Sequence, residues 1–491
     1  RGEYLAFLDS DDTIEPTMLE TLYKKAKSGG YDLVMCDVKI CYVEENRETV
    51  SVSCPQEEID LADYIAYGNN ITYSVNKLFH RSLWEGERYE KMLFEDIALI
   101  PALVTKARSV GYVPQPFYNY YRRGGTISTS QVGAMVDIVD AFEKFLTTCD
   151  PGYKEEAVYA IARQLLWNMT QSRTLFLPDF IGLLRRSEAD FRLNRYLKED
   201  KQAGKILDYL DKPVIPDTFI CAHCRREIPA ALREAIREHF PKASLVGPGE
   251  EWLAREDLPP VVREAADTGR WEFVEEYLSL LALWEQGGIV LRPQAIPGLL
   301  LKRRQMEPVF FGFENTEELS TLCFGAVPHH YVVQALLGSY REEHIYNQAF
   351  LPLAERLRDF LITRFGLRPN GRRQVLEGEV TVHLPSVLAY DLHDGENCCK
   401  RGDLTAPEGF EVVSSQVLEF WSQRLMENWN LYKAERKKRS PGKKPAPSKP
   451  GAAGVQAQLE AERQRVAALY EQSTSWKVTR PLRAIARLWK R

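Results

Sequence analysis

Apolar and polar positions follow two different periods over the first forty residues of the chain. Residues 4–8 and 31–38 form short apolar runs that are typical of strands. Between them, apolar residues recur at helical spacing until a glycine pair at 29–30: Met18, Leu19, Leu22, Tyr23 and Ala26. The order strand, helix, strand predicts an open α/β sheet, in which ligands bind at the carboxyl ends of the strands.

The pattern changes twice further along the chain. Residues 131–212 carry helical repeats and are expected to form a helical connector. A second α/β pattern follows over residues 213–430, in which a predicted amphipathic helix at 273–284 precedes a strand at 288–291. We therefore expect an α/β domain over residues 1–130, the connector, and a second α/β domain.

The end of the chain is basic, whereas the rest is acidic. Residues 433–491 hold 16 Lys or Arg against 4 Glu, and residues 1–432 carry a net charge of −17, which gives −5 for the whole chain. The Lys- and Pro-rich stretch 433–454 predicts a flexible basic linker. Nucleic acid is not expected as a partner, because the acidic body would repel its phosphates.

Residues 455–491 predict an amphipathic helical tail. Leu482, Ile485 and Trp489 share one helical face, and arginines lie off that face. This pattern is typical of a helix that lies on an anionic membrane surface, so peripheral membrane contact is one expectation. The alternative is a solvated basic end whose tryptophan packs on its own domain.

Composition places the chain among ordinary globular proteins, with 44% hydrophobic and 27% charged residues. No apolar run of about 18 residues is present, so no membrane span is predicted, and a cytoplasmic protein or one peripheral to the inner face of the plasma membrane is expected. The nine scattered cysteines suit a reducing cytosol. Cys221 and Cys224 could offer zinc ligands, but no second pair follows at zinc-finger spacing, so buried thiols at strand ends are favoured.

Three carboxylates crowd the end of the first predicted strand: Asp9, Asp11 and Asp12. Neighbouring carboxylates repel one another, so a hard divalent cation that holds phosphates is the first hypothesis for this turn. The alternative is an Asp-rich turn whose side chains only cap the following helix.

Four blocks in order resemble glycosyltransferase family 2. They are residues 5–22 (LAFLDSDDTIEPTMLETL), 75–81 (VNKLFHR), 92–96 (MLFED) and 117–128 (FYNYYRRGGTIS). The resemblance covers residues 1–130 and implies a GT-A fold that binds a nucleotide sugar through a DxD motif and a divalent cation. Family members place a first βαβ half before this point, so the domain is expected to be amino-terminally truncated.

The resemblance implies roles for particular residues. Asp9 and Asp11 would hold Mn²⁺ or Mg²⁺ against the donor diphosphate, with Asp12 assisting. Asp96 would be the general base and Glu95 would orient it. Candidates for diphosphate contact are Lys77, Arg122 and Arg123.

The implied function is that of an inverting glycosyltransferase of bacterial surface-polysaccharide or capsule synthesis. It would move a sugar from a nucleoside diphosphate donor to a saccharide or lipid-linked acceptor. The alternative is a non-catalytic, transferase-like scaffold or acceptor-binding protein of a glycan assembly complex. A glycosidase is disfavoured, because no second acid/base pair is evident.

The second α/β region resembles glycosyltransferase family 32 through residues 276–278, 283–291 and 310–314. That family has its metal-binding DxD where this chain has Arg292-Pro293-Gln294, and an arginine cannot ligate a cation. A catalytically inactive acceptor-binding or docking module, a metal-independent transferase that uses Arg292, and a mistaken resemblance all remain open.

Overall fold

The structure is a computed structural model, and it describes residues 2–54, 60–123, 132–341, 351–389 and 397–402. The predicted linker 433–454 and tail 455–491 lie outside the described residues. The fold is mixed α/β, as predicted from the sequence. Among the helices that the structure describes, none has the length and apolar character needed to cross a bilayer.

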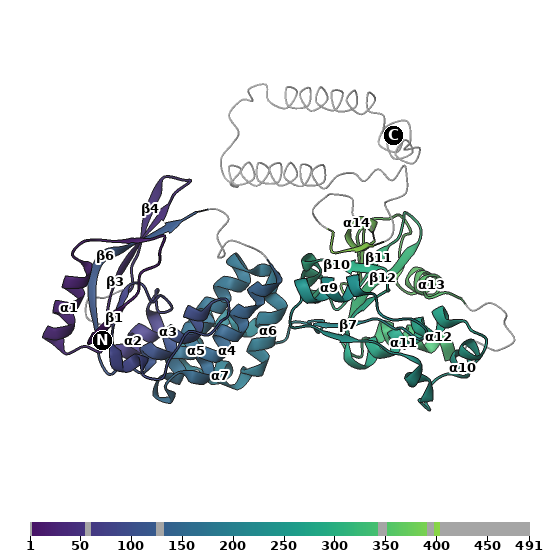
Figure 1. Cartoon of the computed structure of the whole chain (residues 1–491). Coiled ribbons are helices and arrows are strands. Elements are labelled where there is room, and N and C mark those ends of the chain that lie inside the picture. The colour runs from purple at the N-terminus through teal and green to yellow at the C-terminus, as the bar shows by residue number, and fades with distance from the viewer. Residues whose placement is uncertain (1, 55–59, 124–131, 342–350, 390–396, 403–491) are drawn as a thin grey trace, which may run out of the picture. The chain divides into compact units, whose positions relative to one another are not determined.

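The first sheet is built from the amino-terminal residues (Figure 1). Its strands are β1 (Tyr4–Ala6), β2 (Thr13–Ile14), β3 (Leu33–Tyr42), β4 (Arg47–Ser51), β5 (Lys77–His80) and β6 (Val110–Arg122). The order is β1-β5-β3-β6-β2, and β4 also pairs with β3. Only β3 and β6 run parallel, and the other described pairs of this sheet are antiparallel.

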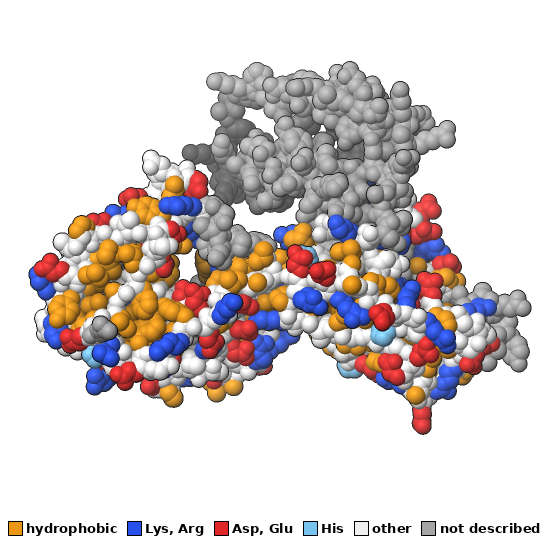
Figure 2. All heavy atoms as spheres, viewed as in Figure 1, with side chains coloured by type: hydrophobic (Ala, Val, Ile, Leu, Met, Phe, Trp, Pro, Cys, Tyr) orange, Lys and Arg blue, Asp and Glu red, His pale blue; other side chains and the backbone are white. Residues whose placement is uncertain are grey.

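Three helices accompany this sheet: α1 (Met18–Gly29), α2 (Leu61–Tyr67) and α3 (Glu95–Thr105). Helix α1 occupies the span that the apolar period predicts, and it ends where Gly30 takes a left-handed conformation with φ of 61°. Met18, Leu22 and Ala26 bury one face of α1 against the sheet, whereas Leu19 and Tyr23 from the predicted apolar face are largely exposed. Figure 2 shows hydrophobic side chains gathered over this first sheet.

Helices fill most of the next eighty residues. They are α4 (Asp137–Thr148), α5 (Lys154–Trp167), α6 (Leu177–Arg186), α7 (Glu188–Leu193) and α8 (Arg195–Glu199). A π-helical turn (Asn168–Ser172) extends α5. Short 3-10 turns also occur in this stretch: Gly133–Val136, Pro151–Tyr153, Thr174–Phe176 and Ala203–Tyr209. Phe142 and Phe180 from these helices share one hydrophobic core with Leu33, Phe79 and Leu103 of the first α/β segment. The helices therefore support the sheet instead of forming a separate core.

A second sheet follows, with the order β13-β14-β11-β12-β9-β7-β8. Its strands are β7 (Thr218–Ile220), β8 (Ser244–Val246), β9 (Gly288–Leu291), β11 (Val309–Phe313), β12 (Leu319–Ala326), β13 (Gln374–Leu376) and β14 (Val380–His383). A small sheet pairs β10 (Ala295–Pro297) with β15 (Cys399–Arg401). The helices of this region are α9 (Ala230–His239), α10 (Pro260–Asp267), α11 (Trp271–Gln286), α12 (Tyr331–Arg341), α13 (Leu353–Phe365) and α14 (Pro385–Leu388). Two 3-10 helices lie in this region, at Glu250–Ala254 and Leu299–Met306, and a further one, Arg81–Trp84, follows β5 of the first sheet.

Helix α11 is buried nearly all round, so the amphipathic helix expected at 273–284 is wrong in character although correct in place. It packs against α10 and α12 as well as the second sheet. The chain then turns directly into β9 through Gly287 and Gly288, both with positive φ. A Cβ atom at Gly288 would lie 2.3 Å from the carbonyl oxygen of Thr218, so only glycine fits this close approach of β9 to β7.

All nine cysteines lie within the described residues, and each is a buried free thiol. Burial raises the pKa of Cys221 to about 11 and that of Cys224 to about 12. This agrees with the prediction of buried strand-end thiols, because Cys221 follows β7 directly and Cys224 lies three residues further along the chain.

Candidate active site

The acidic turn after β1 is held in place by its third carboxylate. Asp12 is only 8% exposed, and its oxygens accept hydrogen bonds from the Tyr118 hydroxyl and the Tyr121 amide, both at 2.8 Å. The Asp9 amide also donates to the Tyr118 hydroxyl, at 3.3 Å. Asp12 therefore anchors the turn to β6.

The other two carboxylates of the turn are accessible to solvent. Asp9 and Asp11 are both exposed, and neither side chain has a hydrogen-bond or ion-pair partner among the residues that the structure describes. Their oxygens are therefore available to a ligand, and the anchored Asp12 fixes where they stand.

A second pair of carboxylates begins α3. Phe94 precedes the helix in a left-handed conformation with φ of 63°, which is unusual for an aromatic residue and turns the chain sharply into Glu95 and Asp96. Glu95 is exposed, whereas Asp96 is half-buried and accepts a hydrogen bond from the Ile97 amide at 2.8 Å.

The fold brings these two acidic segments into one electrostatic group. The pKa of Asp96 is raised to about 6, first by burial and then by the negative charges of Glu95 and Asp9, against the lowering effect of the hydrogen bond from the Ile97 amide. The pKa of Asp9 is also raised, first by partial desolvation of its carboxyl and then by the charges of Asp12, Asp11 and Glu95. Negative charge is thus concentrated here without a compensating cation from the turn itself.

This arrangement fits a divalent cation that is shared with a bound phosphate. Mg²⁺ is commonly held by one or two carboxylates together with substrate phosphates and water, and Asp9 and Asp11 offer two such carboxylates. Within the described ranges no group of three or more His, Cys, Asp or Glu side chains could hold a metal ion by protein ligands alone. A cation at Asp9 and Asp11 would therefore depend on ligand oxygens to complete its coordination.

Lys77 has a different place from the predicted phosphate contact. Its side chain is fully buried, and its ammonium donates to the Asn70 and Tyr73 carbonyl oxygens at 2.6 and 2.5 Å and to the Asn76 side-chain oxygen at 3.0 Å. Burial lowers the pKa of Lys77 to about 7, and the charge of Asp96 opposes this change. Because all three N–H donors are used, Lys77 positions the loop before β5 and does not reach a bound donor in this arrangement.

Arg122 is the last residue of β6, and Arg123 follows it. Arg122 lies with its guanidinium 5.9 Å from the centre of the Tyr42 ring, and its Nε is buried without a hydrogen-bond partner among the described residues. Arg123 is exposed and is the last residue described before the gap at 124–131. The Nε of Arg122 is thus a buried donor without a partner in the described part of the structure.

Arg173 joins this group although the sequence pattern gave no reason to select it. It follows the π-helical turn 168–172, and its guanidinium lies 4.8 Å from the centre of the Phe94 ring. Burial lowers the pKa of Arg173, the positive charge of Arg122 lowers it further, and the negative charge of Asp96 opposes both. Its Nε is also buried without a partner in the described part of the chain. The Arg173 guanidinium therefore lies within electrostatic range of both Arg122 and Asp96.

Aromatic rings border the same group. The Tyr89 ring lies 5.6 Å from that of Trp84 and 6.0 Å from that of Phe7, and Tyr89 is 38% exposed. Burial raises the pKa of Tyr89, and the charges of Asp96, Glu95 and Asp9 add to this. Tyr89 falls in an aperiodic stretch between two matched blocks, so sequence reasoning missed it. It offers an apolar face with a polar tip beside the carboxylates.

Comparison with known proteins finds a family model that matches the first part of the chain. Residues 1–86 match the family model described as glycosyl transferase family 2. This confirms the predicted resemblance for residues 1–86, whereas the blocks at 92–96 and 117–128 lie beyond the matched residues. The predicted resemblance of residues 213–430 to family 32 stays a prediction.

Several curated proteins are similar to part of the chain. A cholesterol galactosyltransferase of Borreliella burgdorferi is 27% identical over 176 residues, which is 32% of this chain and 47% of that protein. A putative glycosyltransferase EpsH of Bacillus subtilis is 33% identical over 131 residues, which is 24% of this chain and 38% of that protein. The chain thus spans about half or less of the length of these two relatives.

Among solved structures, S. aureus TarS 1-349 is similar over 43% of this chain and 65% of that chain, with 16% identity and a TM-score of 0.29. The same protein fragment in complex with UDP-GlcNAc is similar over 42% of this chain and 60% of that chain, with 15% identity and a TM-score of 0.29.

Proposed function

We propose that this protein is a metal-dependent, inverting glycosyltransferase that moves a sugar from a nucleoside diphosphate to a saccharide or lipid-linked acceptor in surface-polysaccharide synthesis. One observation carries the proposal. The fold gathers Asp9 and Asp11 with Glu95 and Asp96, from separate parts of the sequence, into one acidic group in a chain whose residues 1–86 match a glycosyltransferase family.

The residues divide the chemistry between them. Asp9 and Asp11 would hold Mn²⁺ or Mg²⁺, which neutralises the negative charge that grows on the departing diphosphate. Asp12 keeps both in place through β6. Arg122 and Arg173 would add guanidinium groups for anionic oxygens of the donor.

Asp96 would take the proton from the acceptor. The acceptor hydroxyl oxygen forms the new bond to the anomeric carbon from the face opposite the diphosphate, the bond from that carbon to the phosphate oxygen breaks, and the hydroxyl proton passes to the Asp96 carboxylate. The nucleoside diphosphate leaves with the bonding electrons. A pKa of about 6 suits this role, because the carboxylate is ionised at neutral pH and is a stronger base than an ordinary Asp.

Release of nucleoside diphosphate by the full-length protein tests the proposal. We expect UDP-glucose, UDP-galactose, UDP-GlcNAc or GDP-mannose to be turned over in the presence of Mn²⁺ or Mg²⁺, with a large loss when the cation is chelated. A coupled assay for the diphosphate product is the measurement. If none of these donors is bound or turned over, the scaffold alternative is favoured.

The sequence of the tail supports a further part of the proposal, peripheral contact with the inner face of the plasma membrane. The net charge of +12 in residues 433–491 would be attracted to anionic lipid, and the apolar face of residues 482–489 would supply burial. We expect the full chain to sediment with phosphatidylglycerol vesicles at low salt and to be released at high salt. Membrane contact through the tail would be contradicted if a chain without residues 455–491 sedimented with the vesicles as much as the full chain does. It would also be contradicted if binding were the same to neutral and to anionic vesicles.

A further inference from the structure

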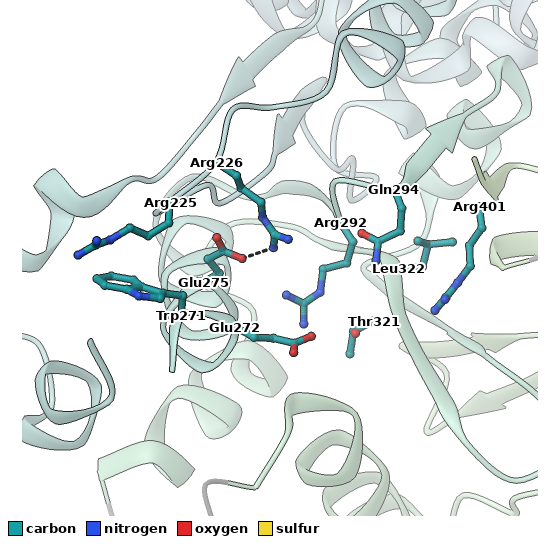
Figure 3. Close-up of a pocket in the computed structure, with 10 residues that line it drawn as sticks. All are labelled: Arg225, Arg226, Trp271, Glu272, Glu275, Arg292, Gln294, Thr321, Leu322 and Arg401. Carbon is teal, nitrogen blue, oxygen red and sulfur yellow. Dashed lines mark hydrogen bonds and ion pairs between the residues drawn. The ribbon is translucent and has the colours of Figure 1, made fainter. Parts of the chain in front are cut away.

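The second sheet carries a pocket of about 310 Å³ that is separate from the acidic group described above (Figure 3). Its lining comes from the segments that follow β7 and β9, from the first turns of α11, and from β12 and β15. Strands β7 and β9 are parallel, and the pocket lies beyond their carboxyl ends, where open α/β sheets bind ligands. Its volume lies at the lower end of the range of small-molecule sites.

Four arginines enter this pocket, and each is already paired with a carboxylate. The pairs are Arg225 with Glu250, Arg226 with Glu275, Arg292 with Glu276 and Arg401 with Glu314. Glu272 adds a fifth carboxylate to this group, of which Glu272 and Glu275 line the pocket itself. Positive charge is therefore fully compensated around the pocket, which opposes the binding of a multiply charged anion.

The pairs also hold the arginines in fixed positions. Glu276 is 4% exposed and accepts from the Leu353 amide at 2.9 Å besides pairing with Arg292. Glu275 is 2% exposed and accepts from the Cys224 amide at 3.0 Å besides pairing with Arg226. Since these carboxylates are held by the backbone, the guanidinium groups face the pocket without needing a ligand to order them.

The lining offers donors and acceptors side by side. The Nε of Arg401 is buried without a hydrogen-bond partner among the residues that the structure describes, so one donor is unused. Glu272 is exposed, and no partner for its carboxylate occurs in the described ranges, so acceptors are unused as well. Gln294 and Thr321 supply groups that can both donate and accept.

A ligand that uses this lining must itself both donate and accept hydrogen bonds while remaining nearly neutral. A sugar ring meets this requirement, because each hydroxyl donates one hydrogen bond and accepts others. An adjoining depression of about 420 Å³ shares Arg226 and Gln294 with the pocket, and its apolar lining includes Pro229 and Ile296. Such a surface can receive the apolar face of a second ring.

We propose that the pocket between Arg226, Glu272, Arg292 and Arg401 is a saccharide-binding site. It binds a neutral oligosaccharide through paired guanidinium and carboxylate groups and uses no metal, in keeping with the arginine at position 292. The proposal does not depend on the reaction proposed for Asp9 and Asp96, because none of those residues lines this pocket.

The test uses the fluorescently labelled full chain on a printed array of mono- to tetrasaccharides, followed by calorimetry with the best-retained probe. We expect retention of a defined set of saccharides. Glu272→Ala and Arg225→Ala should each weaken the calorimetric affinity at least tenfold, since each removes hydrogen-bonding capacity from the pocket. Both side chains are largely exposed, so folding should be unaffected.

Matched control variants lie on α9 of the same region. Glu234→Ala and Arg237→Ala remove the same charges from exposed positions outside the pocket and should leave the affinity unchanged. Affinity for a neutral saccharide should also change little when ionic strength rises from about 0.1 M to about 1 M.

Three results would overturn the proposal. One is retention of no saccharide by the folded wild-type chain. Another is equal binding by the pocket variants and the control variants. The third is a pocket that binds inorganic pyrophosphate but no saccharide. If that binding is salt-sensitive and the pocket variants abolish it, the pocket is an anion site. None of these results depends on turnover of a sugar nucleotide, so the proposed transferase activity is tested separately.

Discussion

Asp96→Asn is expected to lower turnover by about 10² to 10⁴ while the dissociation constant of the donor stays near the wild-type value. Asparagine keeps the shape and the hydrogen bond to the Ile97 amide but cannot accept the acceptor's proton. In the wild type, the rate should rise with pH as Asp96 ionises around pH 6 and then level off. Steady-state turnover from about pH 5 to about pH 8, with donor binding by calorimetry, is the measurement.

The same substitution should stabilise the folded protein at neutral pH. The pKa of Asp96 is raised in the folded state, so the folded state binds the proton more tightly, and stability falls as pH rises from about 3.8 through about 6. A pKa change from 3.8 to about 6 corresponds to about 3 kcal/mol at most. Asp96→Asn should therefore raise Tm at pH 7, whereas a structural role would lower it.

Glu95→Gln is the matched control for Asp96→Asn. Glu95 is exposed and next to Asp96, so its substitution removes one neighbouring charge and should lower the pKa of Asp96. The rate profile should then shift to lower pH with less than a tenfold change at its plateau. If Glu95→Gln lost as much turnover as Asp96→Asn, Glu95 would be the general base instead of Asp96.

Local pattern was sufficient for the acidic turn and the helix after it. Strand β1, the carboxylates and α1 are neighbours in sequence, and their periods of two and 3.6 residues can be read directly. The local sequence pattern could not predict that Asp9 and Asp96 lie close together. Their proximity depends on β6 returning beside β2, so that Tyr118 and Tyr121 hold Asp12, and on α3 beginning at the same end.

Some residues have other contacts than the sequence predicted, and the side chains and backbone around them explain why. Lys77 belongs to a block whose basic residues suggest phosphate contact, yet three oxygens of the preceding loop converge on its ammonium. Arg173 follows a π-helical turn, which the 3.6-residue period does not reveal. Helix α11 has an apolar stripe, but its polar residues are buried too because Glu275 and Glu276 pair with arginines of the pocket.

Asp11→Ala is expected to weaken cation-dependent binding of a nucleoside diphosphate at least tenfold, or by about 1.4 kcal/mol. Asp11 is exposed and has no partner in the described part of the chain, so its removal deletes a charged ligand without leaving a buried group unsatisfied. Calorimetric titration of the full-length protein with UDP or GDP, with and without Mn²⁺, is the measurement.

The neighbouring Ser10→Ala separates loss of a ligand from disturbance of the turn. Ser10 is exposed between Asp9 and Asp11 and carries no charge, so its variant should bind the diphosphate as the wild type does. Removal of the Asp11 charge should also lower the pKa of Asp9, because that charge is one cause of its elevation. Residual Mn²⁺-dependent binding in Asp11→Ala should therefore persist to lower pH than in the wild type. Unchanged affinity in Asp11→Ala, or equal losses in both variants, would contradict a cation site at this turn.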